Sequence, residues 1–363
     1  MKKIVHYIPA LVNGGIESML LNYYNKLNDK YKFIIIVHGD IEKSCRKKFE
    51  SLGAVIYYIP HWTKNFFKHN KELYRILKNE KPSIFHTHHG IYNFLPCMIA
   101  MFSKIKIRIS HCHAYFPKVN KKDKIFSLFS YFFATNYAAC GKGAAEYLVS
   151  FCKNKKNNVK IIYNSIELDK FKYNETVRNK IRKKLNWENN YIYGNVGRFS
   201  LQKNQLFLID IYEKIFQSNN NSRFIIIGGD GEEYSMILNK LNNSLIRDYC
   251  LVLKNISNVN EYYSVMDCLL LPSLFEGFAV TVIEAQASNL PCVLSPTITK
   301  EFLSTNIYYS KSLNNINDWL NIIKKIKFKD RKKVDKTLDI FNINKSCLEL
   351  NIYYSNLIGG KKL

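Results

Sequence analysis

The chain has 363 residues, of which 47% are hydrophobic and 23% charged, and a formal net charge of +25. Its length exceeds the roughly 250–300 residues that one hydrophobic core supports, so two domains are expected and the composition is that of a folded globular protein. No apolar run reaches the roughly 18 residues needed to span a bilayer, and nine cysteines without paired spacing favour the reducing cytoplasm over a disulfide framework.

Apolar runs alternate with amphipathic stretches through the first half, as in repeated βαβ units. Strands are predicted at 3–8, 33–38, 55–59, 84–88, 107–113 and 137–140. Helices are predicted between them, beginning near Ile16 and Ser44. This rhythm predicts a first Rossmann-like domain over residues 1–164, which ends at a polar, turn-like stretch.

The second half repeats the alternation and predicts a second α/β domain over residues 165–340. Its strands are expected at 191–196, 223–227, 251–253, the run before Pro272, and 292–294, with a helix at 279–288. Residues 341–363 form a tail that contains a helix-compatible run over 346–358.

Two carboxylates flank a Gly-Phe turn at the second-half strand that ends before Pro272. Glu276 belongs to the loop after this strand and Glu284 to the following helix. Such a loop and the first helical turn present free N–H groups and partial positive charge, which suits a phosphate. The two carboxylates would reach different parts of one ligand, which argues against a pair of glycosidase acids. An exposed Glu on an ordinary helix is the alternative.

Two cations follow an earlier strand of the same half. Arg198 and Lys203 lie five positions apart just before a helix and could clamp a diphosphate, although a solvated basic loop is the alternative. A Gly-rich turn ending at Gly231 follows the next strand. The third glycine of a dinucleotide fingerprint is replaced by Tyr234, which disfavours a nicotinamide enzyme.

Histidines cluster in the first half, at His86, His88 and His89 and again at His111 and His113. Alternate residues of a strand share a face, so a metal site is one interpretation. No carboxylate or cysteine pair completes a recognisable ligand set, so no metal is predicted. A histidine satisfied within the core is the other alternative for His113.

Two further segments of the first half have compositions typical of contact sites, one for a ligand and one for a membrane surface. The turn at Asn13, Gly14 and Gly15 holds small residues that let a ligand approach the backbone, although a plain tight turn has the same composition. The segment 118–133 couples lysines to an aromatic stretch, as interfacial helices do. A core helix with a solvated start has an equally suitable pattern.

In chain order, these elements resemble the family-4 retaining glycosyltransferases of the GT-B fold. The order is Gly-Gly loop, histidine segment, Gly-Arg-x4-Lys-Asn element, Gly-rich turn and Glu-x7-Glu, and it covers most of the chain. The resemblance implies an α/β protein with two facing Rossmann-like domains, parallel sheets, an interdomain active-site cleft and a C-terminal helix that returns to the first domain. Two departures are Asn289, where a glycine commonly ends the helix, and Ser165-Ile-Glu167 in place of Gly-Ile-Asp. Asn tolerates the left-handed conformation of a helix end.

The resemblance also implies that a sugar moves from a UDP-linked donor to a saccharide acceptor with retention of configuration, without a cofactor or catalytic metal. It assigns His113 and Glu276 to the donor sugar, Arg198 and Lys203 to the diphosphate, and Glu284 to the ribose. The implied catalytic set is His113, Arg198, Lys203 and Glu276. The implied donor-binding set is Gly15, Arg198, Lys203, Gly231, Glu276, Gly277, Phe278, Ala279, Val280 and Glu284.

The basic charge and the interfacial segment favour a polyprenyl-diphosphate-linked acceptor in capsule or exopolysaccharide assembly, at the inner face of the cell membrane. Two alternatives remain. A sugar-nucleotide epimerase has the same architecture and needs no acceptor. A nucleic-acid-binding protein would explain the charge, but no recognition motif supports it, so no nucleic-acid partner is expected.

Overall fold

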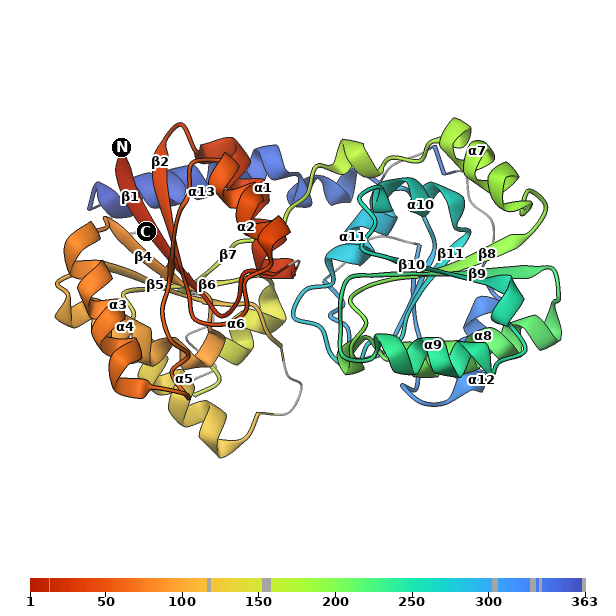
Figure 1. Ribbon diagram of the computed structural model, residues 1–363, viewed down its shortest axis with the longest axis horizontal. Coiled ribbons are helices and arrows are strands. Elements are labelled where there is room, and N and C mark those ends of the chain that lie inside the picture. The colour runs from red at the N-terminus through yellow and green to blue at the C-terminus, as the bar shows by residue number, and fades with distance from the viewer. Residues whose placement is uncertain are drawn as a thin grey trace. The chain divides into compact units, whose positions relative to one another are not determined.

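The computed structural model describes residues 1–12, 14–115, 119–151, 158–301, 306–326, 331–332 and 335–360 (Figure 1). The chain forms two compact units. One comprises Met1–Ile166 with Ile340–Leu363, and the other comprises Glu167–Asp339. Among the described residues, no helix is both long and apolar enough to cross a bilayer.

The first unit is built on a seven-stranded parallel sheet with the order β3-β2-β1-β4-β5-β6-β7. Its strands are β1 (Lys2–Ile8), β2 (Tyr31–Val37), β3 (Val55–Tyr58), β4 (Ile84–Thr87), β5 (Ile107–Cys112), β6 (Asn136–Ala139) and β7 (Val159–Ile161). The central strands are almost continuously apolar because helices cover both faces of the sheet.

Helices α1 (Gly15–Leu27), α2 (Lys43–Ser51) and α13 (Ile343–Ile358) lie on one face of this sheet (Figure 1). Helices α3 (Phe66–Glu80), α4 (Phe94–Phe102) and α5 (Lys121–Phe133) lie on the other, and α6 (Lys142–Leu148) precedes β7. Tyr24 of α1 and Tyr354 of α13 belong to one buried core, while Leu73 of α3 packs in the core of the opposite face. The C-terminal helix is therefore part of the first unit. Ile166 exchanges backbone hydrogen bonds with Phe341 and Ile343 at its start.

The second unit is built on a six-stranded parallel sheet with the order β10-β9-β8-β11-β12-β13. Its strands are β8 (Tyr191–Val196), β9 (Ser222–Gly228), β10 (Cys250–Lys254), β11 (Cys268–Leu271), β12 (Cys292–Leu294) and β13 (Ile307–Tyr309). Its helices are α7 (Glu175–Leu185), α8 (Gln205–Ser218), α9 (Tyr234–Asn242), α10 (Val259–Val265), α11 (Val280–Ala287) and α12 (Ile316–Ile323). The first unit also contains a short 3₁₀ turn, η1 (Gly90–Asn93). Four more follow later in the chain, η3 (Leu168–Phe171), η4 (Leu201–Lys203), η5 (Arg247–Tyr249) and η6 (Lys336–Phe341).

The predicted α/β class with two parallel, Rossmann-like sheets is confirmed. The expected helix at 279–288 is α11, and the expected strand at 191–196 is β8. Asn289 adopts a left-handed conformation, with φ of 47°, so it does end the helix in place of a glycine.

Candidate active site

The candidate site of the second unit lies where the strand order reverses. From β8 the chain builds outward to β9 and β10, and it then returns to place β11 on the other side of β8. Open α/β sheets bind ligands outside the carboxyl ends of strands at such a switch point. The loops that follow β8 and β11 therefore occupy the ligand-binding edge of this sheet.

Hydrogen bonds join these two loops directly. Leu274 N–H donates to the Gln202 carbonyl (2.8 Å), and the Gln202 side-chain amide donates to the Phe275 carbonyl (2.9 Å). The Asn204 amide donates to the Pro272 carbonyl (3.2 Å). The two motifs that the sequence singled out separately are thus one structural assembly.

Lys203 and Glu276 meet inside this assembly. Lys203 Nζ lies 2.6 Å from Glu276 Oε1, and only 14% and 6% of their side chains are exposed. The Gln202 amide lies 3.4 Å from the other carboxylate oxygen. Because both charges are largely withdrawn from water, each depends on the other for compensation.

Arg198 is placed differently from Lys203. Its side chain is exposed, and within the part of the chain that the structure describes its guanidinium has no hydrogen-bond or ion-pair partner. A guanidinium binds phosphate oxygens in a bidentate manner. This site therefore combines one paired, largely buried cation with one unpaired cation in water.

Glu284 lies on α11 and accepts a hydrogen bond of 2.5 Å from the Tyr263 hydroxyl of α10. Burial raises the pKa of the Glu284 carboxyl, and the Tyr263 hydrogen bond and the charge of Lys203 partly oppose that shift. Lys203 thus influences both carboxylates of the Glu-x7-Glu motif.

The Gly-rich turn packs against the basic loop. A Cβ atom at Gly231 would lie 1.8 Å from the Phe199 carbonyl oxygen, and one at Gly197 would lie 3.0 Å from the Lys203 side chain. Close packing against the basic loop therefore explains Gly231, and the Lys203 side chain of the same loop limits the space at Gly197. Any contact of Gly231 with a donor remains a prediction.

Gly277, Phe278 and Ala279 form the loop between Glu276 and α11, and Val280 is the first residue of that helix. The Val280 N–H already donates to the Phe278 carbonyl (3.0 Å), and the Val282 N–H donates to the Ala279 carbonyl (3.0 Å). Of the amides expected to face a phosphate, that of Val280 is engaged within the protein.

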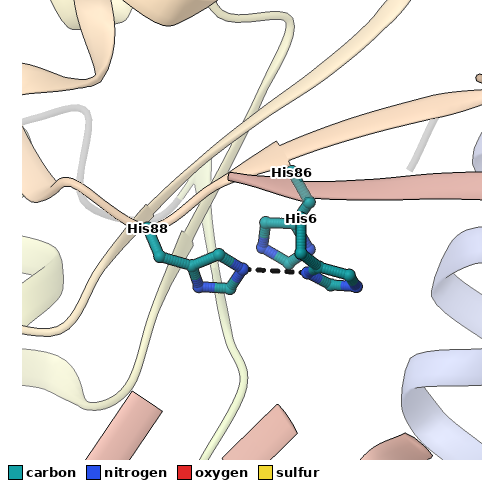
Figure 2. Close-up of side chains that lie close together, drawn as sticks. All are labelled: His6, His86 and His88. Carbon is teal, nitrogen blue, oxygen red and sulfur yellow. Dashed lines mark hydrogen bonds between the residues drawn. The ribbon is translucent and has the colours of Figure 1, made fainter. Parts of the chain in front are cut away.

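In the first unit, His113 directly follows β5 and ends a chain of hydrogen-bonded histidines. Its Nε2 lies 2.8 Å from His88 Nδ1, and His88 Nε2 lies 3.0 Å from His6 Nδ1. Figure 2 shows the contact between His6 and His88. Burial lowers the pKa of His113 to about 3, so its ring is neutral at physiological pH.

Gly15 is the first residue of α1. A Cβ atom there would meet no atom within 4 Å, whereas one at Gly14 would lie 2.6 Å from Glu17 Oε2. Packing within the protein thus requires a small residue at Gly14 and not at Gly15. Asn13, the first residue of this loop, and Lys118, the first of the aromatic segment, lie outside the described residues.

Sequence reasoning did not identify Gln202, Tyr263 or His6 as partners of the site residues. Gln202 carried a usable signal because it lies inside the Gly-Arg-x4-Lys-Asn element. Tyr263 and His6 gave no such signal in the sequence, because only the tertiary fold brings Tyr263 to Glu284 and His6 to His88.

Two protein-family models match the chain in succession. The family described as Glycosyltransferase Family 4 matches residues 13–170, and the one described as Glycosyl transferases group 1 matches residues 177–303. Together they cover every site residue predicted from the motifs, from Gly15 to Glu284. The chain is a glycosyltransferase of the GT-B fold. The family resemblance and enzyme class predicted from the motifs are confirmed.

This glycosyltransferase is 26% identical to the capsular polysaccharide biosynthesis glycosyltransferase CapH of Staphylococcus aureus, over 98% of the chain and 99% of CapH. It is 25% identical to the UDP-Gal:alpha-D-GlcNAc-diphosphoundecaprenol alpha-1,3-galactosyltransferase of Escherichia coli, over 75% of the chain and 72% of that enzyme. Its fold matches that of Anabaena HepE in complex with UDP-glucose, with a TM-score of 0.76 at 16% identity over 99% of each chain.

Proposed function

We propose that this glycosyltransferase moves a sugar from a UDP-linked donor to a polyprenyl-diphosphate-linked saccharide in capsule or exopolysaccharide biosynthesis, with retention of anomeric configuration. The observation that carries the proposal is the loop after β8 at the switch point of the second sheet, which holds the exposed Arg198, without a guanidinium partner among the described residues, and Lys203 of the Lys203–Glu276 pair. The relatives named for capsule assembly and for a lipid-linked acceptor support the biosynthetic assignment.

The barrier lies in cleavage of the bond between the sugar and the diphosphate, because negative charge then grows on the leaving group. Arg198 would bind the diphosphate from solution, and Lys203 would meet it with an ammonium that Glu276 already holds in position. Preorganised charges of this kind are worth about 2.7–4 kcal/mol each in mutational tests, or about 100- to 1000-fold in rate.

Three other side chains would position the donor. Glu276 has a second carboxylate oxygen that can accept from sugar hydroxyls, and Glu284 would exchange its Tyr263 contact for the ribose. His113, neutral because it is buried, would complete the sugar pocket. The leaving phosphate would take the acceptor proton, so no residue is assigned as acceptor base, and the transfer would need no cofactor or catalytic metal.

Helix α5 provides a surface for the lipid-linked acceptor. Its buried residues are Ser127 and Ser130, whose hydroxyls donate to backbone carbonyls. Four of its large apolar side chains are exposed instead, with exposed fractions of 47–75% for Ile125, Leu128, Phe129 and Phe132. The alternative in which all aromatic residues of this segment face the sheet is therefore wrong for Phe129 and Phe132.

Helix α5 also carries Lys121, Lys122 and Lys124 at its exposed N-terminal end. Apolar side chains insert at the boundary between head groups and acyl chains, and each nearby lysine adds about 1 kcal/mol of attraction to anionic lipid. An anionic membrane surface is thus the occupant proposed for this face of α5, where a polyprenyl acceptor would be found.

Thermal stabilisation by a panel of nucleotide sugars tests the donor assignment, because a ligand that binds only the folded state raises the melting temperature. The expected result is a shift with one UDP-sugar that disappears in Arg198→Ala and Glu284→Ala. If no nucleotide sugar stabilises the wild-type protein, the proposed function fails.

A further inference from the structure

Five histidines lie at the carboxyl ends of three adjacent strands of the first sheet. His6 belongs to β1, His86 and His88 to the end of β4, and His111 and His113 to the end of β5. The register pairs His6 with His86 and Thr87 with Ser110, so His88 lies beside His111. Because alternate strand residues share a face, all five rings gather on the side that α1 and α13 cover. Figure 2 shows three of them.

The five rings form two hydrogen-bonded chains. One chain joins His6, His88 and His113, as described above. The other joins the Tyr354 hydroxyl to His86 Nδ1 (2.7 Å) and His86 Nε2 to His111 Nδ1 (3.1 Å). Each chain ends in a buried nitrogen that has no hydrogen-bond partner among the described residues, Nδ1 of His113 and Nε2 of His111. A buried polar atom left without a partner costs free energy and needs an explanation.

The tautomers of the two chains supply one. A neutral imidazole has one N–H and one lone pair. When His113 donates through Nε2 to His88, and His111 donates through Nδ1 to His86, the terminal nitrogens of both chains carry lone pairs. His111, whose Nδ1 then donates to His86, has the arrangement of a metal-binding histidine, in which the second nitrogen donates to a supporting group.

We infer that His88, His111 and His113 bind a divalent transition-metal ion of the zinc type. One nitrogen from each ring lies within 4.8 Å of the other two. Zinc–nitrogen bonds of about 2.0–2.1 Å in tetrahedral geometry bring such nitrogens to roughly 3.4 Å, so small ring movements close the site. Imidazole suits zinc, copper and nickel, and three protein ligands leave a fourth position for water.

This triad is favoured over the neighbouring one formed by His6, His86 and His88, which satisfies the same distance limit. In that second group both nitrogens of His86 and both of His88 already have partners. At the proposed site the ion replaces one contact, the hydrogen bond between His88 Nδ1 and His113 Nε2, and His111 offers a nitrogen that has no partner among the described residues. His113 is also only partly buried, which gives an ion a route to the site.

The consequence of metal binding rests on the proposed function, in which His113 contacts the donor sugar. A His113 ring ligated to a metal cannot make that contact, so the ion and the donor should compete. The metal therefore has no step in the transfer reaction and acts as an inhibitor.

Titration of the full-length, chelator-treated protein with Co²⁺ tests the site by visible absorption, and calorimetry with Zn²⁺ gives the stoichiometry. The wild type is expected to bind one ion, and His113→Ala is expected to lose that binding. His61→Ala is the matched control. His61 is a histidine of the same unit, bonded to Thr63 and outside both chains. Absence of cobalt absorption in the wild type, its persistence in His113→Ala, or its loss in His61→Ala would overturn the proposal.

Nitrogen NMR of the wild-type histidines keeps the test independent of whether a variant folds. Zn²⁺ should shift the resonances of His88, His111 and His113 and leave those of His61 in place, and the reverse pattern would contradict the site. Donor stabilisation is then compared with and without Zn²⁺. If the protein binds metal but no nucleotide sugar raises its melting temperature, the proposed function alone fails. If a nucleotide sugar raises the melting temperature equally with and without saturating Zn²⁺, the ion and the donor do not compete.

Discussion

Lys203 Nζ lies 2.6 Å from Glu276 Oε1, although 73 positions separate the two residues in the chain. The fold brings them together because β8 and β11 are neighbours in the sheet and the loops after them share hydrogen bonds. One ion pair thus links the Gly-Arg-x4-Lys-Asn and Glu-x7-Glu motifs of the second unit.

Loss of either partner of this pair should destabilise the second unit, because the remaining charge is left largely buried. In a double-mutant cycle of Lys203→Ala and Glu276→Ala, the coupling energy measured by urea unfolding should be about 0.5–3 kcal/mol. Additive single effects would show that the pair contributes no interaction energy to the fold.

Arg198→Ala should leave stability within about 0.5 kcal/mol, because the exposed guanidinium has no described protein partner. Its transfer rate should nevertheless fall about 100- to 1000-fold. Arg247→Ala is the control, since Arg247 is also exposed but precedes β10 and so lies at the opposite edge of the parallel sheet. Equal rates for the two variants would remove Arg198 from the site.

Gly231→Ala should destabilise the second unit by about 1–3 kcal/mol or more, because its Cβ would overlap the Phe199 carbonyl. Gly229→Ala provides a matched comparison, since its Cβ would lie 3.5 Å from Asn255, an ordinary contact. Melting temperatures measure both. Similar values for the two variants would show that the turn does not pack as described.

The buried histidines should make the first unit less stable in acid. Burial lowers the pKa of His6, His38 and His113 to about 3 and that of His89 to about 4. Between pH 6.5 and these values the unfolded chain binds more protons than the folded chain. The free energy of unfolding therefore decreases as the pH is lowered, by up to about 1.4 kcal/mol per pH unit for each histidine.

Urea unfolding at several pH values checks this slope. His113→Gln should flatten it by about 1.4 kcal/mol per pH unit, because one titrating group is removed. An unchanged slope would mean that His113 is not held neutral by burial.

The exposed face of α5 should bind anionic vesicles. Two variants of α5 should each sediment less with phosphatidylglycerol vesicles. One combines Phe129→Ser with Phe132→Ser, and the other combines Lys121→Glu, Lys122→Glu and Lys124→Glu. The effect on stability should be small, because these side chains are exposed. Phe67→Ser on α3 is the control, at 86% exposed. Unchanged vesicle binding in both α5 variants would contradict the assignment.

Much of the fold could be predicted because apolar periodicity is local. The run from Tyr191 to Val196 is β8, and the helix after Glu276 is α11. Motif order likewise predicted one site for Lys203, Glu276 and Glu284, and the structure brings Lys203 into contact with Glu276. These predictions required only spacing along the chain and the geometry of parallel strands.

Other features depend on which side chains the tertiary fold brings together. The sequence of α5 left a core helix and an interfacial helix equally possible, because it does not show that Ser127 and Ser130 are the residues that the fold buries. The histidine chains were equally hidden, because His6 enters from β1 and Tyr354 from the C-terminal helix.

Transfer of sugar from a panel of radiolabelled UDP-sugars to a polyprenyl-diphosphate-linked saccharide in anionic vesicles tests the central claim most directly. We expect label in the lipid fraction with one donor and loss of that label in Arg198→Ala. Proton NMR of the product should show that the transferred sugar keeps the anomeric configuration of the donor. A folded enzyme that leaves the lipid fraction unlabelled with every UDP-sugar, or that interconverts the free donors without an acceptor, would contradict it.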